Sequence, residues 1–221
     1  MDAIFFDLDG TLTDPKPGIT RSIQYALDKL GHHTIPTEDE LTWCIGPPLH
    51  SSFVKLLGEA SADLAVSLYR ERFSEIGLYE NSVYAGIRDV LSALRSSGRR
   101  LFVATSKPHV YAERIIDHFD LRDYFEHVFG SELDGTRADK SDLLAYALNA
   151  ASVDPPRATM IGDRSHDMIG ARNNGMKGIG VLYGYGSEQE LTAAGASHLC
   201  ATPKAVLDCI LFAEITTGTG T

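Results

Sequence analysis

Basic residues are scarce in this chain of 221 residues. Lysine and arginine total 20 against 30 aspartates and glutamates, which gives a formal net charge of −10 at pH 7. Nonspecific binding of nucleic acid needs clusters of Lys and Arg that outnumber the acids around them. The sequence contains no such cluster. We therefore expect no nucleic-acid partner.

Cysteine and long apolar runs are also scarce. The three cysteines, Cys44, Cys200 and Cys209, have no C-x-x-C spacing, which argues against a disulfide framework and a zinc site. The longest apolar run near the start, residues 3–6, is too short to span a membrane, and no basic segment precedes it as in a signal peptide. We expect reduced cysteines, no membrane association and a cytoplasmic location.

Short β-rich runs alternate with amphipathic helical stretches along the chain. The runs are apolar throughout, which is typical of a parallel sheet covered by helices on both faces. The expected strands are residues 3–6, 101–104, 127–129, 158–161 and 178–182, and helices are expected around residues 87–94, 139–151 and 165–174. The sequence therefore predicts an α/β fold with a doubly wound, Rossmann-like parallel sheet.

The stretch between the first two expected strands is far longer than an ordinary crossover needs. Its apolar spacing indicates helices only, which end at Gly31, Gly58 and Gly77, and Thr37 and Glu40 have the spacing of a capping box. One expected helix buries Leu64, Leu68 and Phe73 on a shared face. We predict an all-helical domain at residues 16–82, a core formed by residues 1–15 and 83–215, and a disordered tail at residues 216–221.

Polar residues follow the expected strands at the points where the strands end. In an open parallel sheet, functional groups gather beyond the carboxyl ends of the strands, near the point where the strand order reverses. The residues at these positions are Asp7 and Asp9 after the first strand, Thr105, Ser106 and Lys107 after the second, Lys140 after the third, and Asp163 and Asp167 after the fourth. We expect these side chains to meet at one edge of the sheet.

Neighbouring carboxylates repel one another unless a cation compensates them. Asp7 and Asp163 are hard oxygen ligands, and with a backbone carbonyl, waters and a substrate oxygen they suit octahedral Mg²⁺. An aspartate can also act as a nucleophile and form an aspartyl phosphate. The residue types therefore indicate a magnesium-dependent reaction of a phosphate ester.

Each of the other polar residues has a task in such a reaction. Asp7 would attack phosphorus, while Asp9 would protonate the leaving alkoxide and later deprotonate the hydrolytic water. The Thr105 hydroxyl and the Lys140 charge would stabilise the phosphoryl oxygens. Gly10 would let the backbone approach the phosphate closely.

Four segments together resemble the successive motifs of the haloacid dehalogenase superfamily, in the subfamily of phosphoglycolate phosphatases and related small-molecule phosphatases. The segments are "DLDGTLTD" from Asp7, "VATSKP" around Thr105, the single Lys140, and "GDRSHDMIGA" around Asp163. The family carries a helical cap between its first two motifs. This order matches the expected helical stretch at residues 16–82.

The resemblance implies a role for each matching residue. The implied roles are Asp7 as nucleophile and metal ligand, Asp9 as acid and base with its carbonyl on Mg²⁺, Asp163 as metal ligand, Asp167 in or near the outer coordination sphere, Lys140 as the tie between nucleophile and phosphate, Thr105 as a phosphate-binding residue, and Cys44–Phe53 as the cap loop that faces substrate. We also predict that Gly10, Ser106 and Lys107 bind substrate together with Thr105. The implied activity is hydrolysis of a small phosphorylated metabolite.

Several alternatives stay open at this point. Thr105 and Ser106 could also cap the helix after Pro108, a role compatible with phosphate binding because a helix N-terminus binds phosphate as well. Roles at the site for Lys16, Arg21, His50, Arg164 and His166 are undecided. The rival functions are a phosphomutase and a phospho-accepting signalling module. The substrate is phosphoglycolate, a nucleoside 5′-monophosphate, a sugar phosphate or phosphotyrosine, and the oligomeric state is not indicated.

Overall fold

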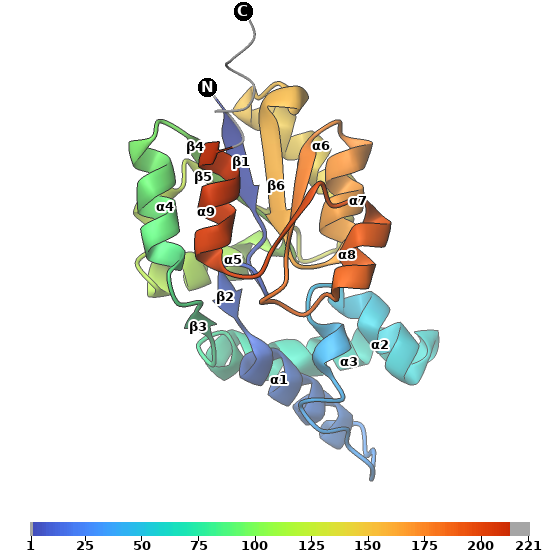
Figure 1. Ribbon diagram of the computed structural model, residues 1–221. Coiled ribbons are helices and arrows are strands. Elements are labelled where there is room, and N and C mark those ends of the chain that lie inside the picture. Colours follow the sequence, from blue (N-terminus) through green and yellow to red (C-terminus); the bar gives the residue numbers. More distant parts are fainter. Residues whose placement is uncertain (1, 213–221) are drawn as a thin grey trace, which may run out of the picture.

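The centre of the protein is a six-stranded sheet in which all neighbouring strands run parallel. The computed structural model describes residues 2–212, so the tail expected at residues 216–221 lies outside the described residues. The strands, in sheet order, are β5 (His127–Ser131), β4 (Arg100–Pro108), β1 (Ala3–Phe6), β6 (Ala158–Gly162), β7 (Lys177–Val181) and β8 (His198–Cys200). The predicted α/β class with a doubly wound parallel sheet is confirmed (Figure 1).

Helices cover both faces of the sheet because both faces of its strands are apolar. Phe5 packs on Phe102 at a ring-centroid distance of 4.8 Å on one face, whereas Ile4 and Phe6 belong to the cluster on the other. The first face is covered by α6 (Lys140–Ala151) and α7 (Ser165–Asn173), and the second by α4 (Ile87–Ser96), α5 (His109–His118) and α9 (Pro203–Phe212). Helix α8 (Glu188–Ala194) packs against α7.

A helical segment lies beside the end of the sheet toward which β1 runs (Figure 1). It contains α1 (Lys16–Lys29), the 3-10 turn η1 (Thr42–Cys44), α2 (Leu49–Leu57), α3 (Glu59–Arg72) and the π-helical turn η2 (Phe73–Gly77). These elements fall within the stretch predicted to be helical. The assignment of residues 16–82 to a separate domain stays a prediction.

The buried face of α3 differs from the predicted one. Leu64 is 57% exposed, while Ala62, Ala65 and Tyr69 are buried. Helix α3 packs against both α1 and α2, and small side chains allow this close approach. Phe73 is buried as expected.

The hydrogen bonds of the capping box at Thr37 form, but no α-helix follows them in the chain. The Thr37 N–H donates to Glu40 Oε2 at 2.8 Å, and the Glu40 N–H donates to Thr37 Oγ1 at 3.3 Å. The chain then continues through turns into η1. The spacing of Thr37 and Glu40 correctly predicted the hydrogen bonds between them, but it did not predict that an α-helix would fail to follow.

A short ribbon joins the helical segment to the sheet and was not expected. Strand β2 (Thr13–Asp14) pairs antiparallel with β3 (Ser82–Val83), and the Tyr84 N–H donates to the Leu12 carbonyl at 3.1 Å. Strand β8 was also missed. Both cases are strands of two or three residues, which are too short to show a hydrophobic period.

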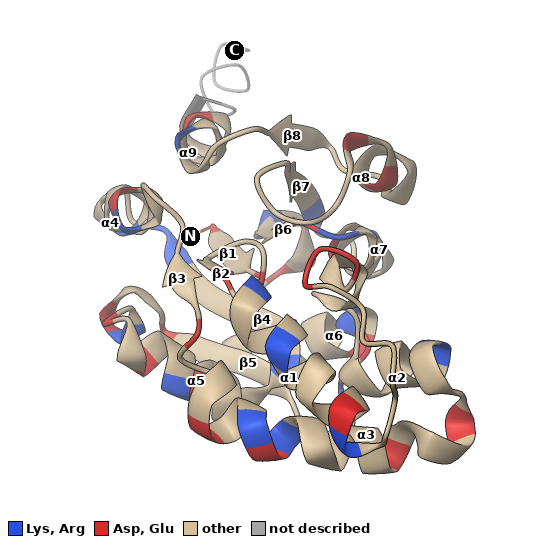
Figure 2. Ribbon diagram, turned by 90° about the horizontal axis from the view of Figure 1, so that it is seen from below, with Lys and Arg blue, Asp and Glu red and all other residues tan. Residues whose placement is uncertain are grey.

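The surface and the cysteines agree with the composition. None of the helices within residues 2–212 is long and apolar enough to cross a membrane. Acidic and basic residues are interspersed along the helices in the view of Figure 2. All three cysteines are free thiols, and burial raises the pKa of Cys44 to about 11 and that of Cys200 to about 12.

Candidate active site

The carboxyl ends of three adjacent strands bring the predicted polar residues together. Strand β1 lies between β4 and β6, so the chain changes direction across the sheet at this point. Asp7 follows β1, Thr105 lies in β4 and Asp163 follows β6, while Lys140 opens α6 after β5. All four side chains are buried. The structure therefore brings residues that are distant in sequence to one place.

Lys140 is the central cation of this group. Its Nζ lies 2.8 Å from Asp7 Oδ1, 2.7 Å from Asp167 Oδ1 and 2.9 Å from the Ala104 carbonyl oxygen. Burial alone would lower the pKa of Lys140, but the charges of Asp167 and Asp7 outweigh it and hold that pKa above its ordinary value. The ammonium group therefore stays charged.

Two local features fix Lys140. The Asp139 side chain caps α6 by accepting from the N–H groups of Ser141 and Asp142, so Lys140 occupies the first helical position. A methyl group at Gly170 of α7 would lie 2.8 Å from Lys140 Cγ, so glycine leaves room for the lysine stem. The Asp139 cap and the close packing against Gly170 together fix the position of the buried lysine.

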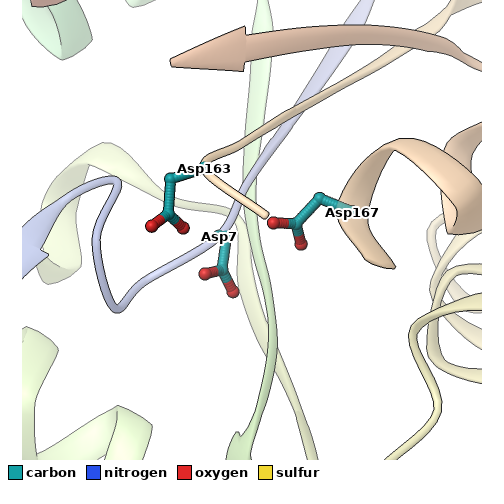
Figure 3. A group of neighbouring side chains, drawn as sticks. All are labelled: Asp7, Asp163 and Asp167. Atoms are coloured by element: carbon teal, nitrogen blue, oxygen red, sulfur yellow. The ribbon is translucent and has the colours of Figure 1, made fainter. Parts of the chain in front are cut away.

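Three aspartates gather around this lysine. One carboxylate oxygen from each of Asp7, Asp163 and Asp167 lies within 4.8 Å of the others, and Figure 3 shows the three carboxyl groups facing a shared space. Burial raises the pKa of Asp7 to about 7, although Lys140 opposes the shift. Burial and the charge of Asp7 also raise the pKa of Asp163 well above its ordinary value. A bound dication would favour the ionised forms.

Asp163 and Asp167 differ in the protein groups that contact their carboxylate oxygens. Asp163 Oδ2 accepts from the Tyr185 N–H at 2.8 Å, but Asp163 Oδ1 has no hydrogen-bond partner among residues 2–212. Asp167 Oδ2 accepts from the Arg164 N–H at 3.1 Å, and Asp167 Oδ1 forms a close ion pair with Lys140 rather than a well-directed hydrogen bond. Asp7 and Asp163 therefore fit a hard divalent cation, while Asp167 is engaged by protein groups.

Asp9 is paired with a second buried lysine. Asp9 Oδ2 lies 2.8 Å from Lys107 Nζ, and Asp9 Oδ1 has no hydrogen-bond partner in the described part of the chain. The Lys107 side chain is only 7% exposed, and its Nζ sits 4.5 Å from the centre of the Phe73 ring. The sequence placed Lys107 near the site but gave no sign of this pairing.

Thr105 and Ser106 do not cap a helix. Helix α5 begins at His109, its N-cap is Pro108, and no side chain caps it, so the capping alternative is wrong. Strand β4 instead continues through this segment, and Thr105 Oγ1 accepts from the Lys107 N–H at 3.2 Å. Both residues line the cavity described below.

The backbone of Gly10 lies close to the side chain of Asp163, whereas the sequence predicted a close approach to phosphate. Its φ is +85°, and a methyl group there would lie 2.2 Å from Asp163 Oδ2. Methyl groups at Gly184 and Gly186 would lie 2.4 Å from Asp163 Cβ and 1.9 Å from the Asp163 carbonyl oxygen. Sequence reasoning missed this second loop, although its G-x-G spacing was a visible signal.

A cavity of about 740 Å³ opens from the aspartates toward the helical segment. Its lining includes Asp7, Asp9 and the segment Gly46–Ser51, which belongs to the loop expected to face substrate. The apolar part of the wall includes Leu49, Val66, Tyr69, Phe73 and Tyr111, and the basic residues Arg70 and Lys107 also line the cavity. Three further acids, Asp63, Glu132 and Asp134, line the cavity away from the buried cluster.

The remaining candidate residues lie in different surroundings. Lys16 pairs with Asp39, and Arg21 pairs with Glu38 and Glu80, outside the cavity lining. His50 lines the cavity and lies 3.3 Å from Asp63. His166 packs near Gly46, and burial lowers its pKa. Arg164 lies outside the cavity lining and donates to Glu190 and to the Ile45 carbonyl.

This fold and this arrangement define an enzyme of the phosphatase class: acids, a buried lysine and a hydroxyl meet at the switch point of a parallel sheet, beneath a helical segment. Residues 4–181 match the family of haloacid dehalogenase-like hydrolases, and the chain belongs to that family. The resemblance stated from the four motifs is confirmed.

Several known proteins are similar to this chain. A 5′-nucleotidase of Pseudomonas aeruginosa is 50% identical over 200 residues, covering 90% of each chain. The tyrosine-protein kinase PtkA of Mycobacterium tuberculosis is 44% identical over 184 residues, which cover 83% of this chain but 62% of that protein. The crystal structure of a predicted phosphatase from Clostridium acetobutylicum has a TM-score of 0.92 and 42% identity, covering 95% of this chain and 98% of that one.

Proposed function

We propose that this enzyme is a Mg²⁺-dependent phosphomonoesterase that acts through an aspartyl phosphate on Asp7. The observation that carries the proposal is the position of Asp7 in the cavity lining, 2.8 Å from Lys140 and near an Asp163 oxygen that has no hydrogen-bond partner within residues 2–212. Asp7, Asp163 and the Asp9 carbonyl would hold the metal. When bound, Mg²⁺ supplies the positive charge that neutralises phosphate.

In the proposed mechanism, different residues act as nucleophile, as acid and base, and as stabilising groups for the phosphoryl oxygens. The Lys140 ammonium favours the ionised form of Asp7, whose free oxygen attacks phosphorus and forms the aspartyl phosphate. Asp9 donates a proton to the leaving oxygen and later accepts one from the water that hydrolyses the aspartyl phosphate. Thr105 and Lys140 stabilise the phosphoryl oxygens. Lys107 must shift from Asp9 Oδ2 whenever that oxygen carries the proton.

The walls of the cavity favour a leaving group with an apolar face. Tyr69, Phe73 and Tyr111 offer aromatic surface for it. The charged side chains of the lining are of both signs, namely Asp63, Glu132, Asp134, Arg70 and Lys107. A nucleoside presents a flat apolar face to the aromatic rings, whereas glycolate has none. Similarity to a 5′-nucleotidase supports the same choice.

We predict that phosphate release from nucleoside 5′-monophosphates exceeds release from phosphoglycolate by at least about tenfold in kcat/KM, which corresponds to about 1.4 kcal/mol of transition-state binding. The measurement is a colorimetric phosphate assay on both esters and on several sugar phosphates, with Mg²⁺ and with EDTA. Equal or faster release from phosphoglycolate would contradict the substrate assignment. No release from any monoester would overturn the phosphatase proposal itself.

The same assays separate the rival functions. A phosphomutase would move the phosphoryl group between hydroxyls of one substrate, so release from unrelated esters argues against it. A signalling module would accumulate a phosphorylated form that survives for minutes without steady phosphate release. Asp9 lies in the same cavity as Asp7 and can serve hydrolysis, which favours turnover over storage.

Magnesium binding should weaken as the pH falls from 8 to 6. Protons compete with the metal for Asp7, whose pKa is raised to about 7, and for Asp163, whose pKa is also raised. Without metal, the raised pKa of Asp7 contributes stability below the ordinary value of 3.8, and this stability is lost as pH rises through about 7. The rise in melting temperature on adding Mg²⁺ should therefore be larger at pH 8 than at pH 6.

Scanning calorimetry at both pH values measures this difference directly. The variant Asp163→Asn removes a proposed ligand and should lose most of the Mg²⁺-induced rise at pH 8. Asp28→Asn, on the exposed side of α1, is the matched control and should keep it. A rise that is the same at both pH values would count against protonation of the ligands as the competing event.

A further inference from the structure

Arg164 connects the aspartate cluster to the loop that covers the cavity. It follows Asp163 directly, and its N–H donates to Asp167 Oδ2 at 3.1 Å. Its side chain points toward the helical segment, where Nη1 donates to the Ile45 carbonyl at 3.0 Å. One residue thus touches both the group around the proposed metal site and the start of the loop Gly46–Leu49.

The Arg164 side chain is held in place before it meets the loop. Nε donates to Glu190 Oε1 at 3.1 Å, and the same oxygen accepts from the Ser165 N–H at 2.8 Å. The side chain is only 14% exposed. A charged hydrogen bond formed by a restrained side chain loses little conformational entropy and is stronger than a neutral one.

The backbone of the loop Gly46–Leu49 packs closely against Arg164 at Gly46. Gly46 has a φ of +100°, and a methyl group there would lie 2.9 Å from Arg164 Cγ. Ile45 is fully buried, while Gly46, Pro47, Pro48 and Leu49 line the cavity. The contact with the Ile45 carbonyl is therefore located where the loop leaves the packed interior and enters the cavity wall.

We infer that Arg164 is a positioning residue that sets the place of the loop Gly46–Leu49 against the leaving group and so contributes to selection among phosphate esters. This inference rests on the proposed function. Arg164 does not line the cavity, so it acts through the loop and not through contact with substrate. Its effect should depend on how far the leaving group reaches into the cavity.

A second arginine provides a matched control. Arg114 of α5 also donates to a carbonyl of the helical segment, that of Ser74, at 2.8 Å, and to Tyr79 Oη at 3.1 Å. It is likewise partly buried and lies outside the cavity lining. Arg114→Gln removes an equivalent contact between the helical segment and α5 without touching the loop.

The test compares R164Q and R114Q on two substrates. Acetyl phosphate has a leaving group too small to reach the loop, whereas a nucleoside 5′-monophosphate fills the cavity. We expect R164Q to lower kcat/KM for the nucleotide about tenfold or more, mainly through KM, and to change acetyl phosphate hydrolysis by less than about twofold. R114Q should change neither by more than about twofold. Glu190→Gln, which frees the Arg164 side chain, should lower nucleotide kcat/KM by a smaller factor.

Hydrogen exchange gives a readout that does not depend on activity. In R164Q the amides of residues 44–53 should exchange faster than in the wild type, and in R114Q they should not. An equal loss on both substrates, an equal loss in R114Q, or unchanged exchange in R164Q would each overturn the inference. If the wild type hydrolyses neither substrate, the proposed function fails, whereas the exchange experiment still decides whether Arg164 holds the loop.

Discussion

Replacing Asp7 by asparagine is expected to lower kcat by at least about 1,000-fold while the protein remains folded. Asparagine keeps the shape of aspartate, and its carbonyl oxygen can still accept from Lys140, which lies 2.8 Å from Asp7 Oδ1. What it loses is the carboxylate oxygen that attacks phosphorus in the proposed mechanism. Steady-state phosphate release and circular dichroism measure the two parts of this result.

The comparison needs a variant with the same chemical change elsewhere. Asp28→Asn, on an exposed position of α1, should leave kcat within about twofold because surface substitutions away from special features are usually small. Trapping with labelled substrate followed by acid quenching should find phosphoenzyme in the wild type and none in Asp7→Asn. Turnover within tenfold of the wild type in Asp7→Asn would reject the covalent route.

Replacing Lys140 by methionine is expected to lower kcat by at least about 100-fold and to destabilise the metal-free protein by about 3–5 kcal/mol at pH 8. Methionine fills the space of the lysine stem beside Gly170. It leaves the carboxylates of Asp7 and Asp167 buried without their cation. Urea unfolding at pH 8 measures the loss of stability, and phosphate release measures the loss of turnover.

The pH dependence of this loss provides an internal check. At pH 5 the Asp7 carboxyl group can be neutralised by a proton, since burial already raises its pKa to about 7 with Lys140 present. The destabilisation should therefore be smaller at pH 5 than at pH 8. Lys177→Met, at the exposed first position of β7, should change stability by less than about 1 kcal/mol. A Lys140→Met variant as stable as this control at pH 8 would show that the lysine does not compensate the aspartates.

The sequence was sufficient to locate the polar residues of the site because they follow a general rule of parallel sheets. Asp7, Thr105 and Asp163 each stand at the end of an apolar strand, and such ends meet at a switch point whatever the details of packing. The fold class followed from the same apolar runs. The catalytic roles of these residues stay predictions.

The partners of these residues could not be predicted in the same way. The ion pair of Lys107 with Asp9 and the approach of Gly184 to Asp163 depend on how separate segments pack, and no local period records them. The helix begins directly after Pro108 as expected, but the capping interpretation of Thr105 failed because β4 continues past its apolar part to Pro108, which is itself the N-cap. Leu64 was assigned to the wrong face because small residues, rather than large ones, form the packed side of α3.

The ribbon formed by β2 and β3 restricts how the helical segment can move. The chain enters and leaves that segment through two strands paired at Thr13 with Val83 and at Asp14 with Ser82. Separating these two crossing points would break the pairing between the strands, which makes independent motion of either connection costly. We therefore expect the ribbon to act as one narrow hinge, so that opening of the cavity is a rotation of the whole helical segment about it rather than local unfolding of α1 or α3.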